Sequence, residues 1–309
     1  MNLIRMLPKV DIIVINWNSG DQTMAAVEPY LNCQSLLLDC KIIIVDNAST
    51  DKSPDLFNGR IDNIIYNTVN VGFGKACNQA FAQSNADYIL LLNPDTVSEL
   101  SVLETLVKFL ENYQDYAVAG PQQHDENGRV LKTCCRFPNF KRSFFELLGL
   151  NKLFPGIFKP CLIMTDWDHL QSKDVDHVMG SYMLIRKSVI NEVGFMDDEY
   201  FMYLEDVDLS KRISNAGYKS YFLSDISIFH EGGGSGGKFA SMRLSYSLTS
   251  RRIYWKKHFG KVQSFILVCV SLVIEPILRV VDSLIKEKKL GVKKIGTAYY
   301  LYVKKMFRA

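Results

Sequence analysis

Four short apolar runs alternate with segments of helical length over the first hundred residues, and this alternation is the strongest constraint on the fold. The runs are rich in Ile, Val and Leu and cover residues 10–17, 41–47, 63–67 and 88–93. Strands that are almost continuously apolar and separated by helices are typical of a parallel sheet covered on both faces. The sequence therefore predicts an α/β domain with a mostly parallel central sheet.

Polar residues follow each of these runs at the point where the predicted strand ends. In open α/β sheets, ligands bind beyond the carboxyl ends of the strands. Because these ends meet at one edge of the sheet, we expect the polar residues to form a single site. They are Asn16 and Asn18 at the end of the first run, Asp46 and Asn47 at the end of the second, Asn70 and Gly72 after the third, and Asn93 and Asp95 at the end of the fourth.

The composition is that of a folded chain with a substantial core. The chain has 309 residues, of which 48% are hydrophobic and 22% charged, and this excludes a disordered protein. Seven cysteines, an odd number without a C-x-x-C pair, favour reduced thiols in a cytosolic compartment and no zinc site. The first 18 residues contain no apolar core of signal-peptide length before the first predicted strand, so we expect no export signal.

The C-terminal region is basic and amphipathic. Residues 286–309 carry eight Lys or Arg against the single Glu287, which favours an anionic surface as partner. The apolar run 265–274 is too short to span a bilayer, and charged residues and a proline interrupt its extension. The polar residues that follow recur at helical spacing, and this pattern predicts an amphipathic helix on the membrane surface, with packing on the protein's own core as the alternative. These residues are Glu275, Arg279, Asp282 and Lys286.

Two further segments have an unusual local composition, one rich in acidic residues and one rich in glycine. Residues 200–217 place Glu205, Asp206 and Asp208 within four residues beside an aromatic segment, and helix capping accounts for one or two of these acids. The glycine run 231–237 lacks the Lys-Ser or Lys-Thr of a phosphate-binding loop, and we interpret it as a mobile loop.

Six motifs in order resemble the inverting family-2 glycosyltransferases with the GT-A fold, and are most similar to bacterial O-antigen and cell-wall rhamnosyltransferases. The resemblance covers about residues 8–260. It implies a Rossmann-like GT-A domain at 1–260, with a nucleotide-sugar half at 8–120 and an acceptor half at 121–260, followed by amphipathic, basic C-terminal helices at 261–309. The motifs are "VDNASTD" (45–51), "NVGFGKACNQA" (70–80), "LLNPDT" (91–96), "GSYMLIRK" (180–187), "GFMDDEYFMYLEDVDLSKRISNAGY" (194–218) and "IFHEGGGS" (228–235).

The resemblance also implies which residues hold the donor. Asp46 is similar to the acid that recognises the pyrimidine ring, although "DNAST" is also a good turn and helix cap. The base and ribose pocket corresponds to Asn16 and Trp17. Close approach of the backbone to the sugar nucleotide is implied at Asn70, Gly72 and Asn78.

Metal and base roles follow from the same resemblance. The leaving diphosphate is commonly neutralised by a divalent cation held by carboxylates. The family's Asp-x-Asp element is Asn93-Pro94-Asp95 here, so Asp95 is expected to be the main acidic ligand and His230 a distal one, although a histidine after a strand is often structural. Mg²⁺ or Mn²⁺ suits this donor set. Asp206 resembles the general base, with Glu205 orienting the base or the acceptor.

Taken together, the resemblance implies a peripheral enzyme on the cytoplasmic face of the inner membrane. It favours transfer of L-rhamnose from dTDP-L-rhamnose to a polyprenyl-diphosphate-linked glycan in O-antigen or similar polysaccharide synthesis. A UDP-hexose donor is one alternative, and an inactive glycan- or partner-binding subunit is another because the metal motif departs from Asp-x-Asp. Nucleic acid is not expected as a partner, since the apolar run beside the basic tail favours lipid.

Overall fold

The computed structural model describes residues 7–31, 33, 35–232, 239–285 and 291–307. The chain divides into two compact units: Met1–Cys135 with Trp167–Asp198 and Asp206–Gly232, and Arg136–Asp166 with Glu199–Glu205 and Gly233–Ala309. Most of the predicted glycine loop and parts of the basic tail lie outside the described residues. The expected domain boundary at residue 260 falls within the second unit, so the division into a transferase domain and a tail stays a prediction.

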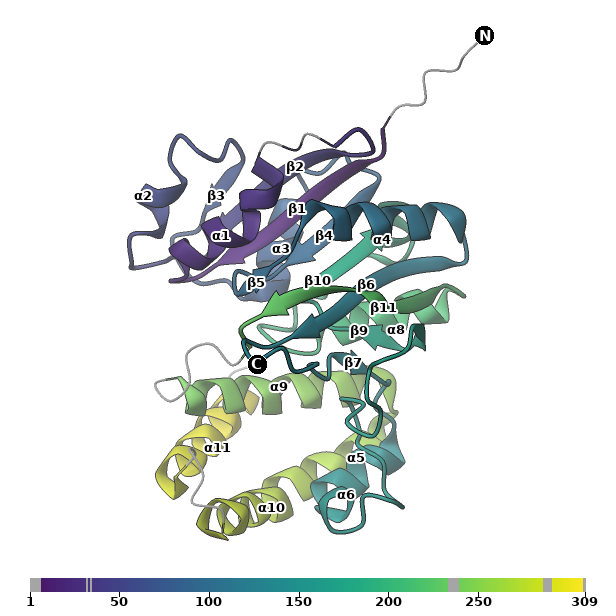
Figure 1. Ribbon diagram of the computed structural model, residues 1–309. Coiled ribbons are helices and arrows are strands. Elements are labelled where there is room, and N and C mark those ends of the chain that lie inside the picture. The colour runs from purple at the N-terminus through teal and green to yellow at the C-terminus, as the bar shows by residue number, and fades with distance from the viewer. Residues whose placement is uncertain (1–6, 32, 34, 233–238, 286–290, 308–309) are drawn as a thin grey trace. The chain divides into compact units, whose positions relative to one another are not determined.

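The first unit contains a sheet that, over the described residues, has nine strands (Figure 1). The strands β3, β2, β1 and β4 lie side by side and are all parallel, as the sequence predicts. The sheet continues through β10, which is antiparallel to β4 and β6, and then through the parallel pair β6 and β11. The bounds are β1 Lys9–Asn16, β2 Asp39–Asp46, β3 Ile64–Tyr66, β4 Tyr88–Leu92, β5 Thr96–Val97, β6 Tyr116–His124, β8 Lys173–Val175, β10 Tyr182–Arg186 and β11 Lys219–His230; β7 Cys134–Cys135 and β9 His177–Val178 form a separate pair.

Helices cover both faces of the sheet. Val10, Ile12 and Val14 of β1 belong to one core cluster with the buried residues of α1 and α4. Because side chains alternate along a strand, Ile13 points to the opposite face, where α3 packs on β1 and β2. The helices of this unit are α1 Gly20–Leu31, α2 Ser53–Phe57, α3 Phe73–Phe81, α4 Leu100–Asn112, α7 Lys187–Val193 and, apart from its first residue, α8 Glu205–Asn215.

The pairing register gathers the polar strand ends at one edge of the sheet. Asn16 lies opposite Asp46 in the parallel β1–β2 pair. His230 at the end of β11 lies opposite Thr96 of the short strand β5, directly after Asp95. The antiparallel strand β10 begins at the same edge, since Tyr182 pairs with Leu92. We call this the carboxyl edge, after the parallel strands that end there.

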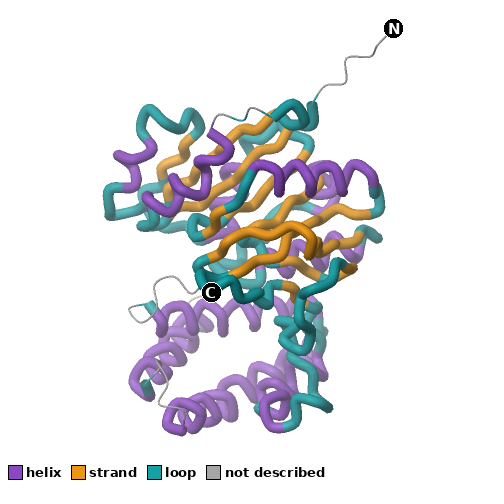
Figure 2. Tube along the Cα trace, viewed as in Figure 1, coloured by secondary structure: helices purple, strands orange, loops and turns teal. Residues whose placement is uncertain are grey.

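The second unit consists of helices and loops in its described part (Figure 2). Its helices are α5 Phe140–Leu147, α6 Leu150–Leu153, α9 Ala240–His258, α10 Lys261–Ile285 and α11 Val292–Met306. Leu248, Ile295, Tyr299 and Tyr302 form a small core between α9 and α11. The helix α10 packs against α5, α9 and α11.

The structure confirms the helix predicted over residues 265–285 and lengthens it. The sequence suggested that Glu275, Pro276 and Arg279 interrupt the apolar run and leave it too short to span a bilayer, but α10 is a single helix of 25 residues that continues through Pro276. A proline removes one helical hydrogen bond, and packing against three neighbouring helices outweighs that loss. Within the described residues, α10 is the one helix long and apolar enough to cross a membrane by length and composition.

Candidate active site

Asn16 and Asp46 meet at the carboxyl edge, where the side chain of Asn16 holds the acid. Asn16 is fully buried, and its Nδ2 donates to Asp46 Oδ2 at 2.7 Å and to Ser49 Oγ at 2.9 Å. The backbone N–H of Ser49 donates to the other carboxylate oxygen of Asp46 at 3.0 Å. Asp46 is therefore fixed from two sides. Trp17, the next residue along the chain, is half-buried.

Asn47 organises the loop that the sequence assigns to the donor. This buried side chain donates to Asn70 Oδ1 at 3.0 Å and to the carbonyl of Gly72 at 3.2 Å, and it accepts from the N–H of Val71 at 3.0 Å. Gly72 has φ +91°, a conformation that favours glycine and precedes α3. Asn70 and Gly72 thus lie next to the end of β2, held there by Asn47, which was predicted among the polar residues of this edge.

Asn78 lies in a different setting from Asn70 and Gly72. Its Nδ2 donates to the carbonyl of Met196 and to Asp198 Oδ1, both at 2.8 Å, and its Oδ1 accepts from the N–H of Met196 at 3.1 Å. This pattern fastens α3 to the 196–198 loop. The structure therefore supports a role for Asn78 in positioning this loop.

The turn Asn93-Pro94-Asp95 places one carboxylate beside His230. The N–H of Asn93 donates to the carbonyl of Ser181 at 2.9 Å, and the Asn93 carbonyl accepts from Thr96 Oγ1 at 2.7 Å. Asp95 Oδ1 lies 3.3 Å from His230 Nε2, and the carbonyl of Asp95 accepts from the N–H of Glu231. The two residues that the sequence pairs as metal ligands are therefore in contact.

Gln123, at the end of β6, sets the tautomer of His230. His230 Nδ1 donates to Gln123 Oε1 at 2.7 Å, while Gln123 Nε2 donates to Ser181 Oγ at 2.8 Å. Nε2, the other ring nitrogen, then faces the carboxylate of Asp95. Gln123 was not among the predicted site residues, although it is a polar residue at a strand end like those predicted on the other strands.

This arrangement fits a divalent cation. Two acceptor atoms 3.3 Å apart, Asp95 Oδ1 and His230 Nε2, are stabilised by a proton or a cation between them. A metal-ligating histidine usually donates its other N–H to a polar partner, as His230 does to Gln123. In the described part of the chain, no group of three or more His, Cys, Asp or Glu could hold a metal. Further ligands would have to come from water and a substrate diphosphate, which suits Mg²⁺ or Mn²⁺.

Asp206 is held as a carboxylate by β9 and the segment before β10. His177 Nε2 lies 3.3 Å from Asp206 Oδ2, and the N–H of Gly180 donates to the same oxygen at 3.2 Å. Burial alone would raise the pKa of Asp206, but the charge and hydrogen bond of His177, with backbone hydrogen bonds from Gly180 and Val207, lower the pKa overall. His177 in turn contacts Ser210 Oγ through Nδ1 at 2.8 Å. His177 was not among the predicted site residues.

The other two acids of the cluster differ from Asp206. Asp208 is fully buried and accepts from Arg212 Nε at 2.9 Å, and the same guanidinium donates to the carbonyls of Val193 and Gly194. Asp208 therefore holds Arg212 against the end of α7. Glu205 is buried at the first position of α8.

The backbone directly before α8 is strained. Tyr203 and Leu204 have φ +73° and +66°, in the left-handed region that non-glycine residues rarely adopt. Each such residue costs about 1–3 kcal/mol and persists where the surroundings impose it, often at functional sites. Neither residue is the Gly or Asn that would have indicated this conformation in the sequence.

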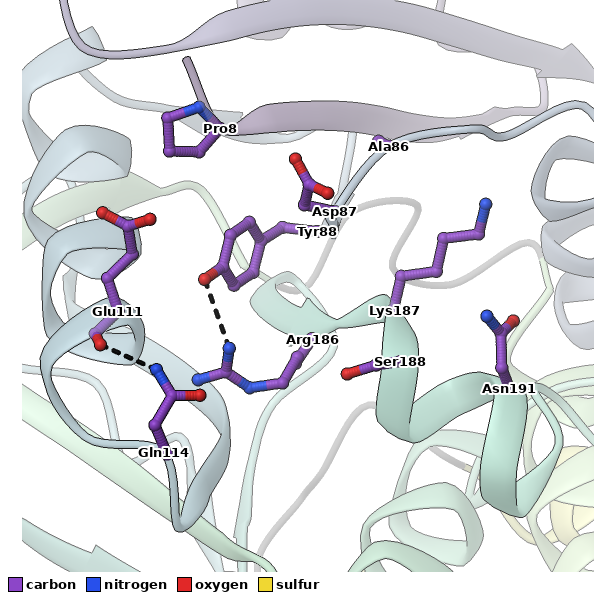
Figure 3. A pocket seen from close by; sticks show the side chains of 10 residues that line it. All are labelled: Pro8, Ala86, Asp87, Tyr88, Glu111, Gln114, Arg186, Lys187, Ser188 and Asn191. Atoms are coloured by element: carbon purple, nitrogen blue, oxygen red, sulfur yellow. Dashed lines mark hydrogen bonds between the residues drawn. The ribbon is translucent and has the colours of Figure 1, made fainter. Parts of the chain in front are cut away.

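A cavity of about 700 Å³ lies at the opposite edge of the same sheet (Figure 3). It is lined by residues near the starts of β1 and β4 and the end of β10, including Pro8, Tyr88, Arg186 and Asn191. Arg186 Nη1 donates to Tyr88 Oη at 3.3 Å, and Lys187 Nζ donates to the carbonyl of Ser84. None of the predicted site residues lines this cavity.

Comparisons with known proteins agree with the motifs and the fold. The chain is 24% identical to the N-acetylglucosaminyl-diphospho-decaprenol L-rhamnosyltransferase of Mycobacterium tuberculosis, over 81% of this chain and 84% of that protein. It is 30% identical to the rhamnosyltransferase WbbL of Escherichia coli K12, over 62% of this chain and 76% of that protein.

Solved structures show the same fold. The mannosyltransferase PcManGT from Pyrobaculum calidifontis, in complex with GDP-Man and Mn²⁺, superposes with a TM-score of 0.55 at 13% identity. The match covers 99% of this chain and 77% of the mannosyltransferase chain. GalNAc-T7 with UDP, GalNAc and Mn²⁺ superposes with a TM-score of 0.54 at 12% identity, over 86% of this chain and 54% of the GalNAc-T7 chain. The profile of glycosyl transferase family 2 matches residues 11–194. The chain therefore belongs to glycosyl transferase family 2, has the GT-A fold and is close to the rhamnosyltransferases.

Proposed function

We propose that this glycosyltransferase moves L-rhamnose from dTDP-L-rhamnose to a polyprenyl-diphosphate-linked saccharide, with inversion at the anomeric carbon. The observation that carries the proposal is the contact between Asp95 and His230 at the carboxyl edge. A divalent cation bound by these two residues would hold the donor diphosphate. The fixed carboxylates of Asp46 and Asp206 come from the same unit.

Donor binding is assigned to the first part of the edge. Asp46, fixed by Asn16 and Ser49, accepts a hydrogen bond from the pyrimidine base. Asn47 shapes the 70–72 segment so that the backbone at Gly72 can pass close to the sugar nucleotide. Asn16 and Asn78 act through the residues that they hold, and Trp17 flanks the base.

Asp95 and His230 would hold the metal, with Asn93 beside them in the same turn. When bound, Mg²⁺ or Mn²⁺ supplies positive charge against the negative charge that develops on the leaving diphosphate. Both solved neighbours described above contain Mn²⁺, which supports a divalent cation. Gln123 keeps His230 in the tautomer that can act as a ligand.

Asp206 acts on the acceptor. Its carboxylate takes the proton from the acceptor hydroxyl while the oxygen of that hydroxyl forms the bond to the anomeric carbon and the bond to the diphosphate breaks. The lowered pKa of Asp206 keeps the group ionised and ready to accept this proton at neutral pH. His177 and Gly180 fix the direction of the carboxylate, and Glu205 supports the start of the same helix.

Relatives support both the transferred sugar and the acceptor. The Mycobacterium tuberculosis protein is named as a rhamnosyltransferase that acts on N-acetylglucosaminyl-diphospho-decaprenol, and a Salmonella anatum relative is named as an O-antigen chain rhamnosyltransferase. A UDP-hexose donor is the second candidate. It is favoured by a hexosyltransferase of Haloferax volcanii, 24% identical over 67% of this chain.

A donor screen tests the proposal. Purified full-length protein is incubated with dTDP-L-rhamnose or UDP-hexoses and a polyprenyl-diphosphate-linked GlcNAc, and nucleotide release and product mass are measured. The proposal predicts a product heavier than the acceptor by one deoxyhexose residue. The anomeric configuration of the added sugar, measured by NMR, should be opposite to that in the donor. Product only with a UDP-hexose would replace the donor, and binding of donor without any product would favour the inactive subunit.

The same proposal places the enzyme at the cytoplasmic face of the inner membrane as a peripheral protein. Its support is the lipid-linked acceptor named for the relative and the apolar helix α10. The basic residues near the C-terminus would favour an anionic lipid surface.

A further inference from the structure

The helix α10 has the reverse polarity of a helix on a water-soluble protein. Its buried residues are Ser264, Leu267, Ser271 and Glu275, three of which are polar. The spacing of residues predicted that the helix has one polar side and one apolar side. It did not predict that the polar side faces the protein interior. The expected arrangement of a surface helix, with apolar residues toward the core, is not present here.

A buried ion pair fixes this orientation. Arg251 of α9 donates to both carboxylate oxygens of Glu275, at 2.9 and 2.6 Å, and Ser271 Oγ donates to the same group at 3.0 Å. Burial by itself would raise the pKa of Glu275, but Arg251 and Arg279 bring the pKa down to about 2. The charge of Glu275 is thus compensated inside the unit, and α10 cannot rotate about its axis without leaving that charge unpaired.

The outward side of α10 is an apolar stripe. Six of its side chains are between 60% and 74% exposed, and they recur along the helix: Val262, Phe265, Val273, Ile277, Leu284 and Ile285. Cys269, also exposed, lies in the middle of the stripe. A helix of this length extends for about 37 Å, so the stripe is far larger than the single apolar residues scattered over ordinary surfaces.

A second apolar patch adjoins the stripe within the same unit. Leu153, Phe154 and Ile157 are 69%, 52% and 75% exposed. The ion pair of Lys152 with Asp282, at 3.7 Å, connects α6 to the C-terminal half of α10, and α5 packs on α10. The patch therefore lies beside the later turns of the stripe.

The sequence on either side of the stripe is strongly basic. Residues 240–309 contain fifteen Lys or Arg and three Asp or Glu, and one of these acids, Glu275, is already paired inside. A partner for this surface must be apolar and carry negative charge. A second copy of the chain would bring two basic surfaces together, which is unfavourable.

We propose that the stripe of α10 and the 153–157 patch together form a lipid-binding surface that lies flat on an anionic bilayer without crossing it. The ion pair between Arg251 and Glu275 holds α10 on α9, which is itself rich in basic residues, so the helix stays parallel to the surface of the unit. The inference gives the peripheral membrane association of the proposed function a defined surface. It is tested without donor or acceptor, so its failure leaves the transferase assay unaffected.

The experiment measures binding of the full-length protein to vesicles. Sedimentation with vesicles of phosphatidylcholine and phosphatidylglycerol is compared for wild type, Val273→Glu, Ile277→Glu and Ile157→Glu. We expect each glutamate to weaken partitioning by about tenfold or more, because it removes one apolar side chain from the lipid contact and adds a repelled charge. Gln263→Glu, which adds the same charge at an exposed polar position of α10, serves as the matched control and should change binding much less.

Circular dichroism and analytical ultracentrifugation on the same samples separate the outcomes. Equal vesicle binding by wild type and by folded Val273→Glu would overturn the proposal. Self-association of wild type that Val273→Glu abolishes, without vesicle binding, would assign the stripe to a second copy instead. Loss of binding in the α10 variants alone would remove the 153–157 patch from the surface.

An environment-sensitive fluorophore on Cys269 gives an independent reading. Cys77, Cys134, Cys135 and Cys161 are buried, so Cys269 is readily labelled once the half-buried Cys33 and Cys40 are replaced by serine. The proposal predicts a blue shift on anionic vesicles and quenching by lipids labelled at a shallow depth. An unchanged spectrum would contradict it, and quenching only by a label at the bilayer centre would indicate a spanning helix.

Discussion

The two edges of the central sheet contrast in how their polar side chains are used. At the carboxyl edge, carboxylates, amides and a histidine contact one another, as in Asp46 with Asn16 and Asp95 with His230. The opposite edge, which we call the amino edge, holds the cavity of about 700 Å³. The cationic side chains there are bound to the protein itself, since Arg186 and Lys187 donate to main-chain carbonyls. The hollow edge is thus stabilised internally, whereas the carboxyl edge concentrates groups with catalytic chemistry.

If donor and acceptor bind at the carboxyl edge, as we propose, the size of a cavity is a poor guide to the active site. In that proposal a donor diphosphate and a metal would complete the carboxyl edge, so the protein would supply only part of the site there. Substitutions at the two edges should therefore have very different effects on transfer.

The largest effect is expected from Asp206→Asn. An amide of the same shape cannot accept the proton of the acceptor hydroxyl, and loss of a positioned base costs roughly 100- to 10,000-fold in rate. Initial rates measure this loss, and calorimetry should show a nucleotide affinity near wild type. Asp225→Asn, at an exposed position of β11, is the control. Retention of more than about a tenth of the activity would remove Asp206 from this role.

The next effect concerns Asp95→Ala and His230→Ala. Loss of a hydrogen-bond partner of a metal ligand lowers metal affinity by about 10- to 100-fold. Each variant removes a proposed ligand itself, so the Mn²⁺ or Mg²⁺ concentration that gives the half-maximal rate should rise by more than this factor. Metal titrations of the rate, with Mn²⁺ binding followed by EPR, measure it. Full activity of the wild type in excess chelator would contradict the metal role altogether.

A smaller effect is expected from Gln123→Ala. Without the Oε1 acceptor, His230 loses the hydrogen bond that fixes its tautomer, and metal affinity should fall by about 10- to 100-fold. Gln123→Glu keeps the acceptor and should retain most of the affinity. Equal Mn²⁺ binding by Gln123→Ala and wild type would mean that the hydrogen bond only supports the fold.

His177→Ala should move the pH profile more than the maximal rate. His177 lowers the pKa of Asp206, so its removal raises that pKa and shifts the acidic limb of kcat/KM to higher pH. His177→Gln, which keeps a donor, should shift the limb less. An unchanged limb in a folded His177→Ala variant would contradict the assigned interaction.

The smallest effect is expected at the amino edge. Asn191→Ala and Gln114→Ala alter the lining of the cavity without touching the carboxyl edge, and transfer rates should remain within about twofold of wild type, since surface substitutions of this kind are usually within about 0.5 kcal/mol. A large loss of activity in either variant would reverse the comparison between the edges.

The sequence predicts the parallel half of the sheet well because its signal is local. Each strand is a short apolar run, and polar residues at parallel strand ends must meet at one edge, so the proximity of Asn16 and Asp46 followed from pattern alone. Asp95 and His230 are far apart in the chain, and their pairing was expected only from the family resemblance.

Other features depend on contacts that no local pattern contains. Gln123 and His177 lie in the mixed half of the sheet and in the separate pair of strands, where the partners are set by long-range pairing. The left-handed backbone at Tyr203 and Leu204 is imposed by tertiary packing on residues that do not favour it. For α10, the periodicity showed two sides, but the inward turn depends on Arg251, which lies in another helix.

Hydrogen–deuterium exchange with bound donor reports which edge of the sheet binds dTDP-L-rhamnose. The protein is compared with and without the donor and Mn²⁺. Donor binding at the carboxyl edge predicts protection in peptides that contain residues 46–49, 70–72 and 93–96, with no change at 111–114 and 186–191. Protection confined to 111–114 and 186–191, around the amino-edge cavity, would contradict it.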